Sequence, residues 1–467
     1  MIVMKFGGTS MGNSEVINRA GKIIQQRLEE GQETVVVVSA MSGVTDSLTH
    51  AARSAASGDD LTFRQIKHRL LSQHHQAVTE CIQDKHRQRE LLDQIETRLS
   101  ELEALCQSIY ILGELTARGM DAVSSLGERL TARILAALLT DQGFPAQAVD
   151  ATELIITNDE FGAAIPLMEK TRDRARSRLL PLLAEGITPV VTGFIGATRD
   201  GITTTLGRGG SDYTAAILGQ ALNADEVWIW TDVDGIMSAD PRLVEEARTL
   251  PQISYAEAAE LSYFGAKVLH SKTIIPTQEA DIPLRILNTL NPSHPGTLVC
   301  RETLQNERAV KGITAITDIA LTTVEGRGMI GVPGIAAKVF TTVAREGVNV
   351  LMITQSSSEQ NICFAIPRTD VERTVKALEE AFAPELTRRN VDRIWVQEAA
   401  IIAAVGAGIQ NTPGVAARLF NALGKHGINC LCIAQGSSKH NISIVVSESK
   451  YEAAVRHIHK ELGLDEE

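Results

Sequence analysis

Cysteine and net positive charge are both in short supply in this sequence. Its 467 residues include six cysteines, and no two of them form a C-x-x-C pair. We therefore expect free thiols rather than disulfides or a zinc site, in a cytoplasmic protein. The formal net charge of −12 disfavours the wrapping of nucleic acid, although local basic groups can still bind an anion.

Long apolar runs are absent as well. The longest charge-free apolar stretch, residues 399–409, is too short to span a bilayer. The first residues, Met-Ile-Val-Met-Lys-Phe-Gly-Gly, lack the basic start and long apolar stretch of a signal peptide. We expect neither a membrane segment nor a secretory leader.

Several catalytic signatures are also missing. The sequence has no G-x-x-x-x-G-K-[ST] P-loop, no G-x-G-x-x-G after the first predicted strand and no G-x-S-x-G elbow. No His/Cys/Asp set has the spacing of metal ligands, so no protein-held metal is expected. His74, His75, His457 and His459 lie on polar helical stretches, where solvated side chains are predicted.

What is present begins with alternating strand and helix signals. Residues 3–6 predict a short strand, and Ser14 is suited to cap a helix that Gly31 ends. Residues 35–38 form a continuous apolar run, typical of a strand buried on both faces. This order predicts a three-layer α/β sandwich with a mainly parallel sheet and functional sites at the carboxyl ends of its strands.

Residues 58–118 have a different pattern. From Leu92 to Leu112, apolar residues recur every three or four positions among many charges, which predicts an amphipathic arm of an inserted helical hairpin. The whole first domain is expected to cover residues 1–300. Residues 291–310 carry two prolines, a glycine and mixed charge, which indicates a linker.

An internal repeat with an offset of 80 residues follows. Residues 333–366 match residues 413–446 without a gap, with 14 identities. Each copy predicts the order strand, Gly-rich turn, helix, strand, turn, strand, helix. The repeat therefore indicates two copies of one α+β module, expected over 310–385 and 395–467.

Three glycine-rich segments follow predicted strands, at residues 5–10, 193–196 and 207–212. Glycine lets a backbone approach a phosphate, and a helix N-terminus supplies aligned N–H groups. Any one such loop is more often an ordinary tight turn. Lys5 favours the phosphate interpretation, because a lysine at a strand end is poorly placed for core packing.

Other charged residues suit an amino acid and a nucleotide. Arg208 offers a planar fork to a carboxylate, and Asp212 can face an ammonium group or simply cap a helix. Asp232 follows an apolar strand, where a carboxylate suits a nucleotide or magnesium site or an ordinary turn. Lys267 adds a second lysine, and Glu128 stands at a predicted helix start, where an acid also stabilises the helix dipole.

Together these segments resemble the aspartokinase family over nearly the whole chain, and the repeat resembles its paired, ferredoxin-like ACT domains. The matching segments are Lys-Phe-Gly-Gly-Thr-Ser at 5–10, Val-Ser-Ala-Met-Ser-Gly-Val-Thr at 38–45, Leu-Gly-Glu-Arg at 126–129, Thr-Gly-Phe-Ile-Gly at 192–196, Leu-Gly-Arg-Gly-Gly-Ser-Asp-Tyr at 206–213, Ile-Trp-Thr-Asp-Val-Asp-Gly at 229–235 and Phe-Gly-Ala-Lys-Val-Leu-His at 264–270. The resemblance implies an amino-acid-kinase fold. It also implies transfer of a phosphoryl group from ATP, with Mg²⁺, to the side chain of L-aspartate, giving 4-phospho-L-aspartate and ADP in lysine, threonine and methionine biosynthesis.

The resemblance further implies roles for individual residues. The implied catalytic residues are Lys5, Arg208 and Asp212. The implied substrate-binding residues are Ser39, Thr45, Glu128, Arg208, Gly209, Gly210 and Ser211. The implied nucleotide-binding residues are Lys5, Gly7, Gly8, Thr231, Asp232, Met237, Arg242, Lys267 and Val268. The family usually has Tyr at the position of Met237, so the ring packing that the family implies near the nucleotide is not expected to carry over here. It also usually has Pro where Ser271 stands, which is a lesser departure.

The repeat resembles threonine-sensitive aspartokinases most closely, including the kinase half of fused aspartokinase–homoserine dehydrogenases; lysine stays open as the effector, and no dehydrogenase is expected in this chain. Effector contacts are expected from Gly331, Asn349 and Gln355, with Asn429 and Gln435 as repeat equivalents. Both asparagines equally suit the end of a turn. Paired modules favour a homodimer or a higher homo-oligomer.

Two alternatives remain. One is another kinase of the same fold, such as glutamate 5-kinase, which is not expected to carry the ACT pair. The other is a catalytically inactive amino-acid sensor, against which the presence of Lys5, Glu128, Arg208, Asp212 and Lys267 speaks.

Overall fold

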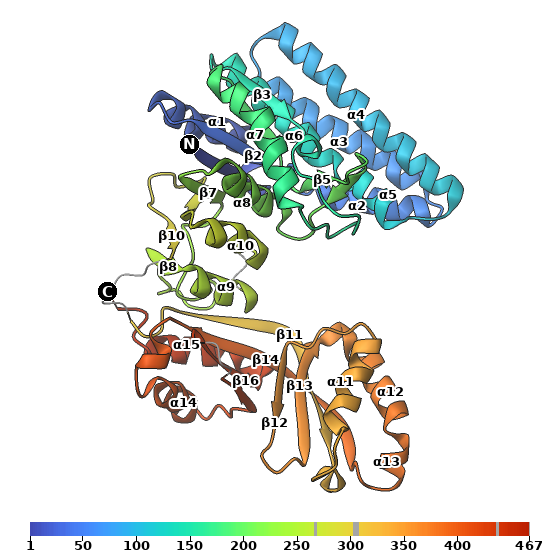
Figure 1. Cartoon of the computed structure of the whole chain (residues 1–467), viewed down its shortest axis with the longest axis vertical. Helices are drawn as coiled ribbons and strands as arrows, with labels where there is room; N and C mark the ends of the chain where they lie inside the picture. The colour runs from blue at the N-terminus through green and yellow to red at the C-terminus, as the bar shows by residue number, and fades with distance from the viewer. Residues whose placement is uncertain (266–268, 302–307, 436–438, 467) are drawn as a thin grey trace. The chain divides into compact units, whose positions relative to one another are not determined.

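The computed structural model describes residues 1–265, 269–301, 308–435 and 439–466 (Figure 1). The chain divides into two compact units. The first unit comprises residues 1–236, 249–259 and 267–303, and the second comprises residues 237–248, 260–266 and 304–467.

The first unit is built on an eight-stranded sheet in the order β3-β4-β2-β1-β7-β9-β10-β8. Its strands are β1 (Ile2–Phe6), β2 (Thr34–Val38), β3 (Ala146–Val149), β4 (Thr188–Thr192), β7 (Glu226–Thr231), β8 (Gln252–Ser254), β9 (Leu284–Asn288) and β10 (Thr297–Cys300). Neighbours from β3 to β9 pair in parallel, whereas β10 runs antiparallel to β9. The predicted mainly parallel sheet is confirmed.

Helices cover this sheet because its strands are apolar on both faces. The helices up to residue 300 are α1 (Ser14–Glu29), α2 (Val44–Ala56), α3 (Asp60–Cys81), α4 (Lys85–Leu112), α5 (Ala117–Ser124), α6 (Leu126–Asp141), α7 (Met168–Ala184), α8 (Gly210–Leu222), α9 (Tyr255–Tyr263) and α10 (Ser271–Ala280). Of these, α1, α6, α7 and α8 pack directly on strands of the sheet, and the end of α9 belongs to the second unit. Met4 and Phe6 of β1 share a core with Ile17 and Ile24 of α1. Successive side chains of a strand point to opposite faces, so Lys5 faces the other layer, where α8 packs.

The two arms of the predicted hairpin are α3 and α4, which lie side by side in Figure 1. Their seam differs from the predicted stripe at its ends. Leu91 and Cys106 are buried in place of Leu92 and Leu105, which are only partly buried, and Leu112 is 75% exposed. The predicted stripe repeats about every 3.5 residues, whereas an α-helix has 3.6 residues per turn. The buried face of a long helix therefore shifts gradually away from such a stripe.

Three further local predictions are wrong. Asn13, not Ser14, caps α1, since its side chain accepts a hydrogen bond from the Val16 N–H at 3.1 Å. His74 is fully buried, with Nδ1 2.7 Å from the Leu70 carbonyl oxygen, and burial lowers its pKa. The 291–310 segment is not all linker, because β10 lies within it and pairs with β8 and β9.

The second unit contains a six-stranded antiparallel sheet in the order β12-β13-β11-β14-β16-β15. Its elements are β11 (Gly312–Glu325), α11 (Ile335–Arg345), β12 (Met352–Gln355), β13 (Asn361–Pro367), α12 (Val371–Ala381), α13 (Ala383–Thr387), β14 (Arg393–Val405), α14 (Val415–Lys425), β15 (Cys432–Ala434), β16 (Asn441–Ser447) and α15 (Tyr451–Glu461). Each repeat has the predicted order of elements. The long strands β11 and β14 pair along their length and so join both modules in one sheet.

Residues 237–248 contribute buried side chains to the core of the second module. Ala239 and Val244 belong to the same buried cluster as Ile402 of β14. Ser238 accepts a hydrogen bond from the Ile313 N–H at 2.7 Å, and its hydroxyl lies 2.9 Å from His459 Nε2. His459 is only 1% exposed, so its predicted solvation is wrong. Its polar neighbours in the sequence gave no sign that a distant segment covers it.

Candidate active site

The carboxyl ends of four adjacent parallel strands carry the motifs singled out in the first unit. Strands β4, β2, β1 and β7 are neighbours in the sheet. They lead into the segments that begin at Gly193, Ser39, Gly7 and Asp232, respectively. Parallel strands end at one edge of a sheet, so these segments gather there.

One cavity of about 560 Å³ lies among these segments. It is lined by most of the residues that were predicted for catalysis, substrate and nucleotide: Lys5, Gly7, Gly8, Ser39, Thr45, Glu128, Arg208, Gly209, Gly210, Ser211, Asp212, Thr231 and Asp232. Residues as far apart in the sequence as Lys5 and Asp232 thus meet at one site.

Lys5 lines the cavity at the predicted phosphate site. Its side chain is only 9% exposed, and its Nζ forms an ion pair with the Asp212 carboxylate in the first turn of α8. A Cβ at Gly7 would lie 3.3 Å from this Nζ, so glycine leaves the amine room at the end of β1. The pair joins a strand end to a helix N-terminus, where anions are favoured.

Glu128 enters the cavity from the first turn of α6. A Cβ at Gly127 would lie 2.7 Å from the Ala40 Cβ, so glycine allows α6 to approach the 39–45 loop. Glu128 Oε1 then accepts a hydrogen bond from the Ala40 N–H at 3.2 Å. Its Oε2 is buried and has no hydrogen-bond partner in the described part of the chain. Burial raises the pKa of Glu128 to about 8, against the opposing effects of the Ala40 N–H and the Lys5 charge.

Arg208 is the exposed residue of the short loop between β6 (Thr203–Thr205) and α8. Gly209 has a φ of +71°, and a Cβ there would lie 2.5 Å from the His270 Cβ. Glycine is therefore required on both conformational and steric grounds. Among the described residues, no ion pair holds the Arg208 guanidinium, so it is available to an anionic ligand. Burial, then the charges of Lys272 and Arg208, lower the pKa of His270.

Phe194 and Asp46 also line the cavity but were given no role from the sequence. Phe194 has a φ of +69°, which is unusual for a bulky residue. Its N–H donates to Thr214 Oγ1 at 3.0 Å, and its carbonyl accepts from the Leu206 N–H at 2.8 Å. Its place between two glycines in Gly193-Phe-Ile-Gly196 was the available signal for this sharp turn.

Two of the predicted nucleotide-binding residues, Met237 and Arg242, are not among the residues that line this cavity. Met237 and Arg242 belong to the second unit. Arg242 there pairs with Asp240 at 2.6 Å. Lys267 and Val268 lie outside the described residues.

A second cavity, of about 310 Å³, lies in the first ACT-like module. Gly331 and Gln355, both predicted effector contacts, line it, and Glu359 joins them. The Gly331 N–H donates to Glu359 Oε2 at 2.8 Å. Asn349 does not line this cavity, and Asn429 and Gln435 belong to the second module.

None of the helices within the described ranges is long and apolar enough to cross a membrane. Over the same ranges, no cluster of three or more His, Cys, Asp or Glu side chains is suited to hold a metal ion.

Comparison with known proteins gives the family. The model of the amino acid kinase family matches residues 1–288, and the ACT domain model matches residues 323–382 and 402–462. Bifunctional aspartokinase/homoserine dehydrogenase 1, chloroplastic, of Zea mays is 39% identical over 99% of this chain and 50% of its own length. Aspartokinase 1, chloroplastic, of Arabidopsis thaliana is 33% identical over 98% of this chain and 79% of its own. The chain spans about half the length of the bifunctional relatives it matches.

Solved structures agree over the whole chain. Aspartokinase III of E. coli in complex with aspartate and ADP (R-state) has a TM-score of 0.83 and 31% identity, covering 99% of this chain and 100% of that one. The same enzyme in complex with lysine and aspartate (T-state) has a TM-score of 0.80 and 32% identity, covering 99% of each chain. With a catalytic family model over more than half of its residues, two ACT matches and an aspartokinase aligned along its full length, this chain belongs to the aspartokinase family.

Proposed function

We propose that this chain is an ATP-dependent aspartate kinase that converts L-aspartate and ATP to 4-phospho-L-aspartate and ADP. The observation that carries this proposal is the convergence of Lys5, Glu128 and Arg208 on one cavity. Aspartokinase III of E. coli, a relative of matching length, has been solved with aspartate and ADP.

The cavity offers a partner for each charged pole of an amino acid. The guanidinium of Arg208, which forms no ion pair with the residues that the structure describes, suits the α-carboxylate, because its planar fork matches two oxygens. Oε2 of Glu128, which has no hydrogen-bond partner among those residues, suits the ammonium group, because an arriving cation favours the charged form of a buried carboxyl. Ser39, Thr45 and Ser211 add hydroxyl groups around the same space. The side-chain carboxylate of aspartate is then left to react.

Reaction requires one anion to approach another. Lys5 and the backbone N–H of Gly8 supply positive charge at the end of β1, where the γ-phosphate would lie. The Gly7 N–H donates to the Trp230 carbonyl at 3.1 Å, so Gly7 contributes close backbone approach instead. The nucleophile is already ionised at neutral pH, so positioning and charge neutralisation carry the step and no general base is needed. Asp212 holds the Lys5 amine in place.

Mg²⁺ would bind with ATP, since it usually keeps substrate phosphates, waters and only one or two carboxylates as ligands. Asp46, Asp212 and Asp232 line the cavity, and such carboxylates fit this mode without a dedicated protein cage. When bound, the ion neutralises phosphate charge. Thr231 and Asp232 mark the nucleotide side, and Met237, Arg242, Lys267 and Val268 remain predicted contacts there.

The decisive experiment is aspartate-dependent ADP release combined with trapping of the acyl phosphate by hydroxylamine. A hydroxamate that forms only with ATP, Mg²⁺ and aspartate is expected. Glutamate, acetylglutamate, carbamate and UMP serve as competing acceptors. Faster ADP release with one of these, or none with any acceptor, would overturn the proposal.

The proposal includes feedback control by an amino acid, with threonine favoured and lysine possible. The 310 Å³ cavity between Gly331 and Gln355 supports an effector site in the first module, and a relative has been solved with lysine. Asn349, Asn429 and Gln435 remain predicted effector contacts. Titration of activity with threonine and lysine, separately and together, tests this part, and insensitivity to both would remove it. A homodimer or larger homo-oligomer is also proposed, and light scattering after gel filtration measures it.

A further inference from the structure

The short strand β6, which precedes the Arg208 loop, is a run of three threonines fixed at three points. Thr203 Oγ1 accepts from Arg129 Nη2 at 3.3 Å. Thr204 Oγ1 lies 2.8 Å from Thr157 Oγ1. Thr205 Oγ1 donates to Asp121 Oδ1 at 2.7 Å. Every side chain of the strand is therefore tied to a different segment.

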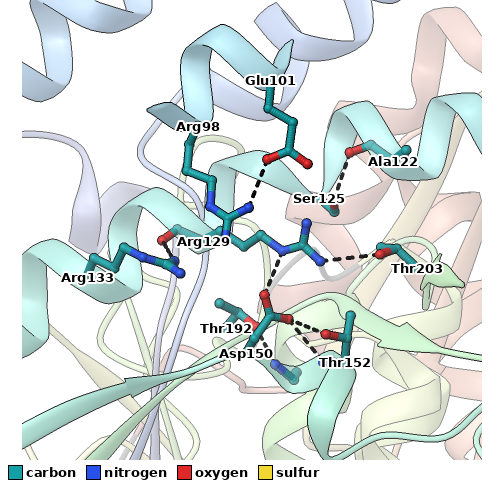
Figure 2. A network of polar contacts seen from close by, with 11 residues as sticks. Arg98, Glu101, Ala122, Ser125, Arg129, Arg133, Asp150, Thr152, Thr192 and Thr203 are labelled. Carbon is teal, nitrogen blue, oxygen red and sulfur yellow. Dashed lines mark hydrogen bonds and ion pairs between the residues drawn. The ribbon is translucent and has the colours of Figure 1, made fainter. Parts of the chain in front are cut away.

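Figure 2 shows the first of these ties, with Arg129 of α6 reaching between Asp150 and Thr203. Arg129 Nε lies 2.7 Å from Asp150 Oδ2, and the side chains of the pair are only 12% and 17% exposed. Asp150 Oδ1 accepts in turn from the Thr152 N–H and hydroxyl at 3.1 and 2.7 Å. Arg129 directly follows Glu128, so this tie begins one residue from the cavity.

The second tie comes from Asp121 of α5, which is 1% exposed. Beyond the Thr205 hydroxyl, its Oδ2 accepts from the N–H groups of Thr205 and Gly162, each at 2.9 Å. A Cβ on Gly207 would lie 3.1 Å from the Gly162 carbonyl oxygen, so the segment held by Asp121 also borders the Arg208 loop.

A purely structural role explains this arrangement less well. Replacing a poorly exposed ion pair with apolar groups of similar size is often neutral or stabilising, so such pairs are weak evidence of a contribution to stability. Hydrogen bonds between charged groups instead fix the relative orientation of the segments that they join. Here these hydrogen bonds involve Thr205, three residues before Arg208, and Arg129, one residue after Glu128.

We propose that Arg129, Asp121 and the β6 threonines form a positioning element that sets Arg208 against Glu128 on the aspartate side of the cavity. The inference rests on the proposed function, because Arg208 and Glu128 are its substrate contacts. It predicts that loosening β6 impairs the use of aspartate and spares the use of ATP, whose predicted contacts lie on other segments.

The test compares Thr203→Val and Thr205→Val, which remove the hydroxyls and keep the side-chain shape. Steady-state kinetics with each substrate varied and thermal unfolding are measured on the full chain. The expected result is a KM for aspartate raised about 5- to 30-fold, with the KM for ATP within about twofold of the unmodified value. Thr203→Ser, which keeps the hydroxyl, is expected to have the KM for aspartate of the unmodified chain.

Thr140→Val is the matched control. Thr140 Oγ1 donates to the Ala136 carbonyl at 2.9 Å and accepts from the Ala146 N–H at 3.2 Å, near the opposite end of α6. Its KM values are expected to stay unchanged. An unaltered KM for aspartate in both β6 variants, or an equal rise for both substrates that Thr140→Val reproduces, would overturn the positioning role alone. A lack of aspartate-dependent ADP release by the unmodified chain would overturn the proposed function and the positioning role with it.

Discussion

The Glu128 carboxylate and the Ala40 N–H, 3.2 Å apart, connect the first turn of α6 to the loop that follows β2. The contact holds one carboxylate oxygen in a buried position, and Oε2 has no partner within the described ranges. Burial without a partner for Oε2 favours the neutral form of the group, and an arriving cation would favour the charged form.

The pH dependence of aspartate use follows from this environment. Burial raises the pKa of Glu128 to about 8, so the charged form that binds ammonium is lost as the pH falls through that value. We expect kcat/KM for aspartate to rise from pH 6.5 to 8.5 with an inflection near 8. In Glu128→Gln this inflection should vanish and the value should be lower throughout. A wild-type inflection that persists in the variant would assign the titration to another group.

Lys5→Ala should lower kcat by about 10²- to 10³-fold, as expected when one preorganised charge is removed from the transferring phosphoryl group. The circular dichroism spectrum should stay native. Lys22→Ala, at an exposed position of α1, is the control and should leave turnover unchanged. Near-normal turnover of Lys5→Ala in coupled ADP release would refute the role.

Arg208→Lys keeps the charge but loses the planar fork. If Arg208 binds the α-carboxylate, the KM for aspartate should rise about 10- to 100-fold while that for ATP changes little. Steady-state kinetics with each substrate varied in turn measures both. A loss confined to ATP would move Arg208 to the nucleotide side.

Two glycine substitutions separate backbone strain from collision. Gly143 and Gly209 both have positive φ, but a Cβ at Gly143 meets nothing within 4 Å, whereas one at Gly209 meets His270. Gly143→Ala should cost about 1 to 2 kcal/mol of unfolding free energy. Gly209→Ala should cost about 1 to 3 kcal/mol more, because the added methyl group also collides with the side chain of His270. Urea denaturation measures both, and equal losses would contradict the contact with His270.

The repeat provides its own control for the effector site. Gln355 lines the 310 Å³ cavity, and Gln435 is its equivalent in the second module. Gln355→Ala should raise the threonine concentration for half-inhibition about tenfold, the loss of one hydrogen bond to a charged ligand. Gln435→Ala should have a smaller effect. The reverse order would place the dominant effector site in the second module.

Much of the fold was predictable because it follows local patterns. Apolar runs such as Val35–Val38 and the strand–helix alternation specified a parallel sheet, and that topology brought Lys5, Arg208 and Asp232 to one edge. The internal repeat predicted two modules with the observed order of elements.

Contacts between distant segments were not predictable. His74 and His459 have polar sequence neighbours, and only the packing of other elements buries them. Phe194 adopts its left-handed conformation because Thr214 and Leu206 hold its backbone. Asp121 has no motif of its own, and its three hydrogen bonds come from residues 41 and 84 positions away.

Residues 237–248 have a practical consequence for dissecting this chain. Ala239 and Val244 are buried among side chains of the second module, although they precede Gly312 by more than 60 residues. Truncation after residue 303 would uncover these apolar groups and leave Ser238 without the backbone donor of Ile313. We therefore expect that the two modules cannot be deleted without exposing part of the remaining chain. An isolated amino-terminal fragment is expected to aggregate rather than to act as a kinase without feedback control.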